Sequence, residues 1–248
     1  MPSDHSRHRP DQPAAAPRTR DEELLSVGPG FPPPAETDPE RLERIEQEVA
    51  YGFRAMQDLG AAVSVFGSAR TLPDNGEYQL ARRFGAAIGR AGFGVITGGG
   101  PGIMEAANRG ATEVAARSVG LNIELPEEQV PNEFLDLALH FHYFFVRKLM
   151  FIRYSCAFVI FPGGFGTLDE LFEALTLIQT DKIRQFPVIL VGSGYWTPLL
   201  DWMRTNLYTP GRVSPEDRGL LHIDNDPDSA ARTIVRAYRR QQAAGDVS

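Results

Sequence analysis

Two glycine-rich turns, each lying between a short apolar run and a helical pattern, constrain this chain most. They are VITGGGPGIME, which begins at Val95, and VIFPGGFGTLDE, which begins at Val159. Their residues align in pairs, namely Gly99 with Gly163, Gly100 with Gly164, Gly102 with Gly166, and Met104 with Leu168. A helix N-terminus exposes unpaired amides and partial positive charge, and glycine lets the backbone approach an anion closely. The two turns therefore predict a site for a phosphorylated ligand, although one such turn alone could serve only to join a strand tightly to a helix.

The rest of the chain alternates between strand and helix patterns. We expect strands at 63–67, 94–98, 118–123, 138–142, 157–161 and 187–192. We expect helices at 40–59, 76–91, 103–117, 143–154, 168–180, 195–206 and 228–240. Continuous apolar strands separated by helices predict a mostly parallel sheet covered on both faces. With right-handed crossovers, this is an α/β, doubly wound, Rossmann-like single domain that binds ligands beyond the carboxyl ends of its strands.

The composition of the chain ends suggests where this domain begins and stops. Residues 1–38 are rich in proline, arginine, aspartate and alanine and lack periodic apolar positions, so we expect a disordered N-terminal tail. Residues 39–241 are then the Rossmann-like nucleotide-binding domain, and residues 242–248 a frayed C-terminus. No apolar run is long enough to span a membrane and no hydrophobic signal core is present, so we expect a cytoplasmic protein.

Charge and cysteine content exclude several other classes of function. The formal net charge of −7 argues against nucleic-acid binding, which needs a basic surface. The single cysteine, Cys156, excludes an intramolecular disulfide and a multi-cysteine metal site. His140 and His142 form an H-x-H pair, but no further ligands recur at a useful spacing, and we therefore expect no metal.

Two common nucleotide-binding signatures fail at the glycine turns. Ile103 stands where the last glycine of G-x-G-x-x-G belongs, and no Gly-Lys pair completes a G-x-x-x-x-G-K loop. The sequence thus gives little support to a dinucleotide-dependent dehydrogenase or a P-loop NTPase.

Three polar residues near the predicted turns each have a structural and a functional interpretation. Glu170 follows Thr167 by three positions, so the pair is either a helix capping box or a carboxylate facing a bound sugar. Arg147 is either a snorkelling arginine on an amphipathic helix or a guanidinium aimed at a phosphate or ribose. Ser68, in the FGSAR segment with Arg70, is either a turn hydroxyl or a phosphate or ribose contact.

A longer motif connects these residues. Residues 162–170, PGGFGTLDE, carry the pattern P-G-G-x-G-T-x-x-E, and Arg147 lies upstream in an Arg-Lys pair. Over about residues 60–210 the chain resembles the Lonely Guy (LOG) family of cytokinin riboside 5'-monophosphate phosphoribohydrolases. The resemblance implies hydrolysis of the N-glycosidic bond of a nucleoside 5'-monophosphate, which releases the free base and ribose 5-phosphate. It also implies that Arg147 and Glu170 are the catalytic pair.

The resemblance completes the set of expected substrate-binding residues. Lys148, Thr176 and, if one gap is allowed, Glu128 match substrate-contacting positions of the family, and Met104 lies in its first glycine motif. The full expected set is Ser68, Gly99, Gly100, Gly102, Met104, Glu128, Lys148, Gly163, Gly164, Gly166, Thr167 and Thr176. The family implies no metal or organic cofactor and a homodimer or higher homo-oligomer.

The chain also departs from the short plant members of the family. It has the N-terminal tail, a first glycine turn one residue tighter, and an extension from about residue 213, and it resembles the longer bacterial members. Both a cytokinin riboside 5'-monophosphate and AMP-like purine nucleotides therefore remain candidate substrates. One alternative is a non-catalytic module that resembles a molybdenum-cofactor carrier. Another is a lysine decarboxylase, for which Lys148 and Lys182 would be the only candidates to hold pyridoxal phosphate.

Overall fold

The computed structural model describes residues 19–26, 36–126, 130–180, 182–183, 186–214 and 219–245. Its centre is one seven-stranded sheet with the order β4-β3-β2-β1-β5-β6-β7, and every neighbouring pair of strands is parallel. The strands are β1 (Ala62–Phe66), β2 (Gly94–Thr97), β3 (Ser118–Ile123), β4 (Leu137–Phe141), β5 (Ser155–Ile160), β6 (Val188–Leu190) and β7 (Leu221–Ile223). The predicted doubly wound, parallel α/β fold is confirmed.

The direction in which the chain adds strands reverses beside β1. From β1 the chain proceeds outward to β4, then returns to place β5 on the other side of β1 and continues to β7. Strand β1 therefore pairs with both β2 and β5. At such a switch point the connections on the two sides leave on opposite faces of the sheet, which opens a crevice at the carboxyl ends of the strands.

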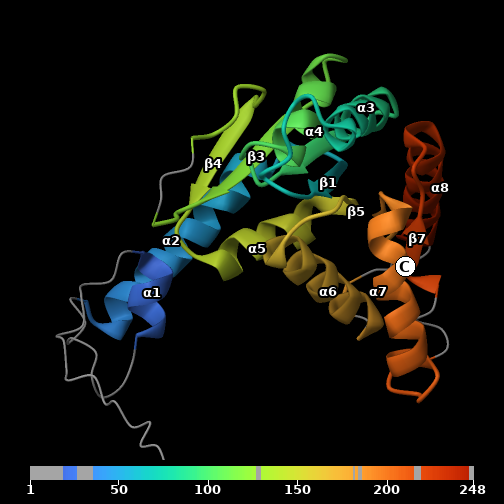
Figure 1. Cartoon of the computed structure of the whole chain (residues 1–248). Coiled ribbons are helices and arrows are strands. Elements are labelled where there is room, and N and C mark those ends of the chain that lie inside the picture. The colour runs from blue at the N-terminus through green and yellow to red at the C-terminus, as the bar shows by residue number, and fades with distance from the viewer. Residues whose placement is uncertain are drawn as a thin grey trace, which may run out of the picture.

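Helices cover both faces of the sheet (Figure 1). They are α1 (Arg20–Leu25), α2 (Asp38–Met56), α3 (Gly76–Arg90), α4 (Ile103–Thr112), α5 (Phe144–Tyr154), α6 (Phe165–Gln179), α7 (Ser193–Met203), the π-helical turn η1 (Arg204–Tyr208) and α8 (Pro227–Gly245). Helices α3, α4 and α8 pack on one face, and α2, α5, α6 and α7 on the other. None of the helices in the described ranges is long and apolar enough to cross a membrane.

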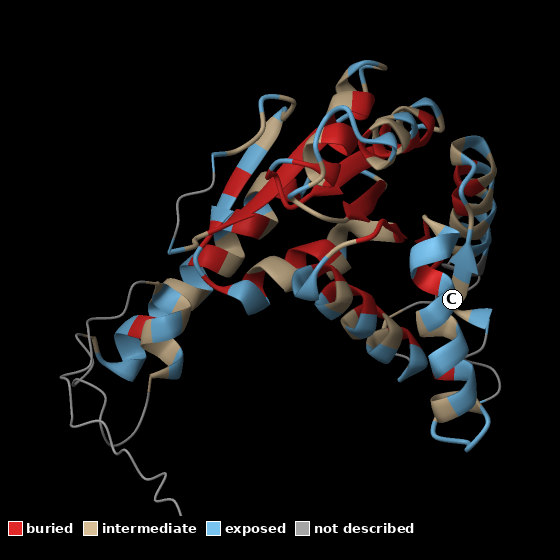
Figure 2. Cartoon of the chain, in the orientation of Figure 1, coloured by how far each residue is buried: buried red, intermediate tan, exposed pale blue. Residues whose placement is uncertain are grey.

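Alternating side chains of the strands divide the interior into two clusters. In β1, Ala62 and Phe66 belong to the cluster under α5 and α6, whereas Val63 and Val65 belong to the one under α3, α4 and α8. The middle of the sheet is buried on both faces, as Figure 2 shows. This two-sided burial explains why the strands appear in the sequence as apolar runs and not as alternating patterns.

Several elements differ from the sequence-based expectation. Helix α1 lies within residues 1–38, where we predicted disorder, while the stretches 1–18 and 27–35 of that tail lie outside the described residues. Strand β7 was not predicted because its three residues are half-buried or exposed and do not form the apolar run of a buried strand. Helix α4 ends at Thr112 and not near residue 117, since Ala115 adopts a positive φ of 56°. The domain limits at residues 39 and 241 stay predictions.

The packing of α3 on α4 depends on the absence of a side chain at Gly110. A Cβ there would meet the carbonyl oxygen of Arg82, which belongs to the backbone of α3. We expect Gly110→Ala to lower the free energy of unfolding by about 1–3 kcal/mol, because two helix backbones must separate. The matched control is Gly194→Ala in α7, where no atom lies within 4 Å of the added carbon. Chemical denaturation checks both variants, and equal stabilities would contradict this account.

Candidate active site

Three chain segments meet at the carboxyl edge of the sheet beside β1. The loop after β1 is bound to the one after β5, since the Ser68 amide donates to the Pro162 carbonyl over 3.0 Å. It is also bound to the start of α4, because the Ile103 amide donates to the Ser68 carbonyl over 3.0 Å. Gly102, at a φ of 70°, allows this contact, since a Cβ there would meet the backbone of Ser68 and Ala69. These bonds gather the two predicted glycine turns around Ser68.

The second glycine turn opens α6 in a way that overturns the capping interpretation of Glu170. Helix α6 begins at Phe165 with Gly164 as its N-cap and has no side-chain cap. Thr167 therefore lies inside the first turn and cannot be the N-cap of a capping box with Glu170. Its side chain instead packs against Gly163, where a Cβ would clash with it. Glu170 lies one turn deeper in the helix and is left available for another role.

A cavity of about 670 Å³ opens where these segments meet. Six of its lining side chains are polar, and they are Ser68, Arg70, Arg147, Thr167, Asp169 and Glu170. Six other lining side chains are apolar and form what we call the apolar wall, and they are Phe66, Met104, Ile123, Leu125, Phe144 and Phe151. The main chain contributes Gly98, Gly164 and Gly166. The cavity thus combines polar and apolar lining side chains, as a site for a small polar ligand with an aromatic part requires.

Glu170 places a carboxyl group in this cavity under unusual conditions. Its exposed fraction is 7%, and within the described part of the chain its Oε2 atom has no hydrogen-bond partner. Burial raises the pKa of Glu170 to about 7, against the opposing charges of Lys148 and Arg147. A carboxyl group that titrates near neutral pH in a cavity is suited to acid–base or charge-stabilising chemistry.

Arg147 enters the same cavity from α5. Its Nε donates to the Leu121 carbonyl over 2.7 Å, and its guanidinium carbon lies 5.3 Å from the centre of the Phe151 ring. The guanidinium also packs on Gly98, where a Cβ would clash with it. Burial lowers the pKa of Arg147 to about 10, while the nearby Glu170 opposes that shift. The guanidinium is therefore held at three points and stays charged at neutral pH.

The remaining predicted residues divide into those that line the cavity and those that do not. Ser68, Met104, Gly164, Gly166 and Thr167 line it together with the expected catalytic pair. Six predicted residues do not line it, and these are Gly99, Gly100, Gly102, Lys148, Gly163 and Thr176. Glu128 lies outside the described residues.

At the predicted positions of the first glycine turn, backbone groups bond to other residues of the protein and do not face the cavity. The carbonyls of Gly99 and Gly100 both accept from the Asn132 side chain over 3.1 Å. The Gly99 amide donates to Thr97 Oγ1 over 2.9 Å. Only Gly98, one residue earlier, lines the cavity. Substrate contacts by the three aligned glycines of this turn stay predictions.

Lys148 is held beside the cavity by two carboxylates. Its Nζ lies 2.9 Å from Asp169 Oδ1 and 3.0 Å from Glu173 Oε2. Burial alone would lower the pKa of Lys148, but the two ion pairs outweigh it and hold the pKa above its ordinary value. A lysine that forms a Schiff base must lose its proton readily, so this environment does not suit pyridoxal phosphate.

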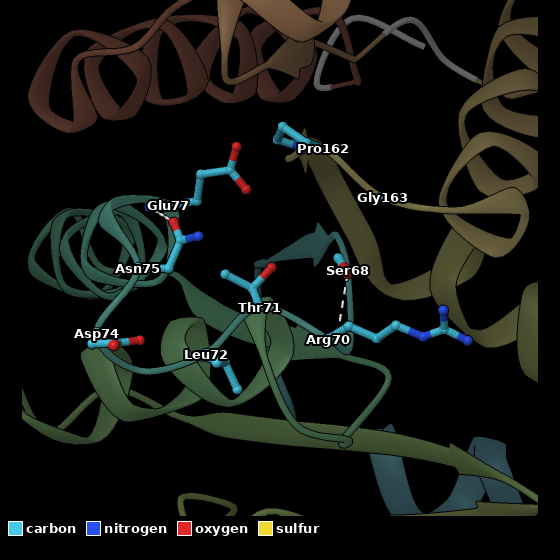
Figure 3. A pocket seen from close by; sticks show the side chains of 9 residues that line it. All are labelled: Ser68, Arg70, Thr71, Leu72, Asp74, Asn75, Glu77, Pro162 and Gly163. Carbon is cyan, nitrogen blue, oxygen red and sulfur yellow. Dashed lines mark hydrogen bonds between the residues drawn. The ribbon is translucent and has the colours of Figure 1, made fainter.

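A second hollow of about 610 Å³ adjoins the cavity on the α3 side of Ser68 (Figure 3). It is lined by Ser68, Arg70, Thr71, Leu72, Asp74, Asn75, Glu77, Pro162 and Gly163. Figure 3 shows Arg70 extended away from Asn75 and Glu77, with its amide bonded to Ser68 Oγ over 3.1 Å. Gly163 of the predicted set lies here, next to the cavity and not in it. Among the described residues, no group of three or more histidine, cysteine or acidic side chains is suited to a metal ion.

The apolar wall contains the residues that sequence analysis did not identify. Ile123 ends β3 and Leu125 follows it, while Phe144 and Phe151 lie on α5. In the sequence they look like ordinary core positions. The only available signal is that Phe144 and Phe151 bracket Arg147 at helical spacing.

Comparison with known proteins assigns the chain to a family. Residues 104–234 match the family described as possible lysine decarboxylase, which is more than half of the chain. The cytokinin riboside 5'-monophosphate phosphoribohydrolase of Mycobacterium tuberculosis is 33% identical over 162 residues, or 61% of this chain and 82% of that protein. The chain belongs to the LOG family. A protein of that name from Rhodococcoides fascians is 29% identical to this LOG member over 163 residues, or 63% of this chain and 80% of that protein.

More distant relatives share only part of the molecule or only the fold. The pyrimidine/purine nucleotide 5'-monophosphate nucleosidase of Escherichia coli is 32% identical over 126 residues, which are 47% of this LOG chain but only 28% of the E. coli protein. The molybdenum cofactor carrier protein of Chlamydomonas reinhardtii has a TM-score of 0.53 at 22% identity, covering 72% of this chain and 98% of that one. The second likeness shows the fold alone.

The buried carboxyl of Glu170 should make folding stability depend on pH. The folded state holds this proton up to about pH 7, whereas the unfolded chain releases it near the ordinary value of 4.5, so stability falls as pH rises through this window. We expect Glu170→Gln, which cannot titrate, to be more stable than the wild type by roughly 3 kcal/mol at pH 8 and about equal below pH 4.5. Urea unfolding at several pH values tests this, with the exposed Glu46→Gln as control. Parallel pH profiles for Glu170→Gln and the wild type would contradict the buried-carboxyl account.

Proposed function

We propose that this LOG protein hydrolyses the N-glycosidic bond of a nucleoside 5'-monophosphate and releases the free base and ribose 5-phosphate. The observation that carries the proposal is the convergence of a buried carboxyl group, Glu170, and a fixed guanidinium, Arg147, on one cavity beside a glycine-rich helix start. The names of the relatives support it, since the mycobacterial and E. coli proteins are named for reactions on nucleoside or nucleotide 5'-monophosphates.

The phosphate would bind at the N-terminus of α6. This end of the helix has no side-chain cap and no acidic residue in its first turn. Gly164 and Gly166 line the cavity there, and no atom lies within 4 Å of where their Cβ atoms would be. Unpaired amides, the positive end of the helix dipole and open space together suit a phosphate group. Thr167 and Ser68 would donate hydroxyl hydrogen bonds to the same group.

The chemical step assigns one task to each member of the pair. The bond between C1′ of the ribose and the base nitrogen breaks, the oxygen of a water molecule bonds to C1′, and one of its protons ends on the base. Glu170 as a carboxylate would stabilise the positive charge that develops on C1′ and orient the water. Arg147 would bind the ribose phosphate and hold C1′ beside Glu170. Lys148 would assist by stabilising the carboxylate form of Glu170.

The base would lie against the apolar wall. Ile123, Leu125, Phe144 and Phe151 offer a surface on which a purine ring can rest, and a prenyl group on the base would extend the same contact. We therefore include both plain purine nucleotides and cytokinin riboside 5'-monophosphates in the substrate class. Because nucleoside monophosphates are charged and do not cross lipid readily, a cytoplasmic location fits this substrate class.

The loss of the Glu170 carboxylate should abolish most of the activity without unfolding the protein. We expect Glu170→Gln to reduce turnover of a nucleoside monophosphate by ~10²–10⁴-fold, because the charge that stabilises C1′ is removed. Turnover is measured by chromatography, as the rate at which free base is released from AMP, GMP and the 5'-monophosphate of 6-prenyladenosine. Glu46→Gln is the control. A folded Glu170→Gln variant with normal turnover would refute the catalytic role. Tight binding of nucleotides by the wild type without base release would favour a carrier.

We also propose that the protein forms a homodimer through α5 and α6. Large apolar side chains are exposed on these neighbouring helices, and they are Phe145, Leu149, Phe165 and Phe172. Phe165 is 92% exposed and lines the cavity, so a second copy packed here would also cover the cavity mouth. An apolar patch of this kind on a soluble protein is typical of an interface.

Association can be tested on the same face. We expect a dimer of the wild type in sedimentation equilibrium, and a monomer for the double variant Phe145→Glu, Leu149→Glu, since two charges would be buried at the interface. Leu42→Glu, at an exposed position of α2, is the matched control and should leave the dimer intact. A wild type that is monomeric at high micromolar concentration would rule out this interface.

A further inference from the structure

The helix that carries Arg147 does not cap its own N-terminus. Its N-cap residue, Tyr143, makes no side-chain capping bond, and the first turn of α5 contains no acidic residue. The first amides of any helix have no partner within the helix. Those at the start of α5 must therefore be satisfied from outside.

Carboxylates from the two N-terminal helices bind three consecutive amides at this point. Oε1 of Glu48 in α2 accepts from the amides of His142 over 3.0 Å and Tyr143 over 3.1 Å. Oδ2 of Asp21 in α1 accepts from the amide of Phe144 over 3.0 Å. Glu48 is only 9% exposed, and its second oxygen lies 2.8 Å from His142 Nδ1. The bonds span more than 90 positions in the sequence, so they fix α5 relative to another part of the fold.

Helix α2 continues to contact α5 beyond the capped end. Gly52 lies so near α5 that a Cβ there would be 2.7 Å from Met150 Sδ. The guanidinium of Arg153 lies 4.4 Å from the centre of the Phe53 ring, and the Tyr154 hydroxyl donates to the Phe53 carbonyl over 3.3 Å. These contacts hold the C-terminal half of α5, whereas Glu48 and Asp21 hold its start.

The held segment leads directly into the cavity. Phe144 lines the cavity wall, and the Arg147 amide donates to the Tyr143 carbonyl over 3.1 Å, which makes Arg147 the next turn of the same helix. The guanidinium has its own bond to Leu121, but that bond fixes only the end of a long side chain. A shift or fraying of the first turn of α5 would move Phe144 and the backbone of Arg147 together.

We infer that Glu48 and Asp21 are positioning residues, which hold the first turn of α5 so that Arg147 and Phe144 face the substrate. The inference rests on the proposed function. It gives α1 and α2, the two helices that precede β1 in the chain, a specific part in the reaction. Neither residue touches the cavity, and each acts through backbone amides.

Alanine and amide variants separate positioning from simple loss of charge. Glu48→Ala and Asp21→Ala remove the acceptor, whereas Glu48→Gln and Asp21→Asn keep an oxygen that can accept the same bonds. We expect kcat/KM for AMP to fall on the order of 10- to 100-fold in the alanine variants and to stay near the wild-type value in the amide variants. Glu46→Ala, on the exposed side of α2, should behave as the wild type.

The pH dependence of the rate provides a readout that a purely structural role would not change. Arg147 and Lys148 lower the pKa of Glu170, while Glu173 and Asp169 raise it. If Arg147 moves away, the pKa of Glu170 rises, because one of its two stabilising charges is lost. The acid limb of kcat/KM should therefore lie at higher pH in Glu48→Ala and Asp21→Ala than in the wild type or Glu46→Ala.

Each outcome decides the matter. Reduced kcat/KM with a shifted acid limb in the alanine variants, and recovery in the amide variants, supports the inference. Wild-type kinetics in the alanine variants, or a loss that only follows the fraction of folded protein with an unshifted limb, overturns it. Asp21→Ala keeps the test decisive if Glu48→Ala fails to fold, because the short helix α1 has no buried residue. A wild type that hydrolyses no nucleoside monophosphate overturns the proposed function and this inference with it, whereas an active wild type with unaffected variants overturns the inference alone.

Discussion

The pairing of β1 with β5 is the constraint on which the rest of the site depends. The Phe161 amide donates to the Phe66 carbonyl over 2.9 Å, and the Ser68 amide to Pro162 over 3.0 Å, so the two strands stay joined to their very ends. Their connections leave on opposite faces of the sheet, and α6 begins immediately beyond the join. Without this pairing, the loop after β1 and the turn at Gly163 would not lie side by side at the carboxyl edge of the sheet.

The cavity contains a buried carboxyl group whose charge is only partly compensated, which folding alone would not favour. A carboxyl group is costly to bury, and Glu170 has an oxygen without a partner among the described residues. Arg147 and Lys148 offset part of that cost, but each is itself engaged elsewhere, with Leu121 and with two acidic side chains. An incompletely compensated buried charge of this kind is expected where a group must interact more strongly with a transition state than with its own protein.

The N-terminal helices α1 and α2 help to fix the position of a cavity residue from outside the cavity. Arg147 is fixed at its tip by a strand carbonyl and at its backbone by a helix whose start is bound by Glu48 and Asp21. A site built on a helix needs that helix held along its length, since small displacements are costly to catalysis. Helix α2 supplies that support through direct packing at Gly52 and Phe53.

Part of this protein could be predicted from the sequence with little ambiguity. The parallel sheet followed from the apolar runs, because strands buried on both faces need apolar side chains at every position. The choice of Arg147 and Glu170 as the catalytic pair followed from the resemblance to the LOG family, and their catalytic roles stay predictions. The start of α6 could not be predicted, since Thr167 and Glu170 fit a capping box as well as they fit the first two turns of a helix that begins at Phe165.

By itself, then, the sequence determined the fold class, because apolar runs and helical patterns alternate along the chain, and the two glycine turns, because each is encoded in a short stretch of neighbouring residues. Only the tertiary structure decided that Gly98 lines the cavity while Gly99 faces Asn132, and that apolar side chains of β3 and α5 line the same cavity as Glu170. It also decided that Glu48 caps a helix more than 90 residues away. These relations join segments whose separation along the chain carries no information about their distance in space, so they arise only when the sheet brings the segments together.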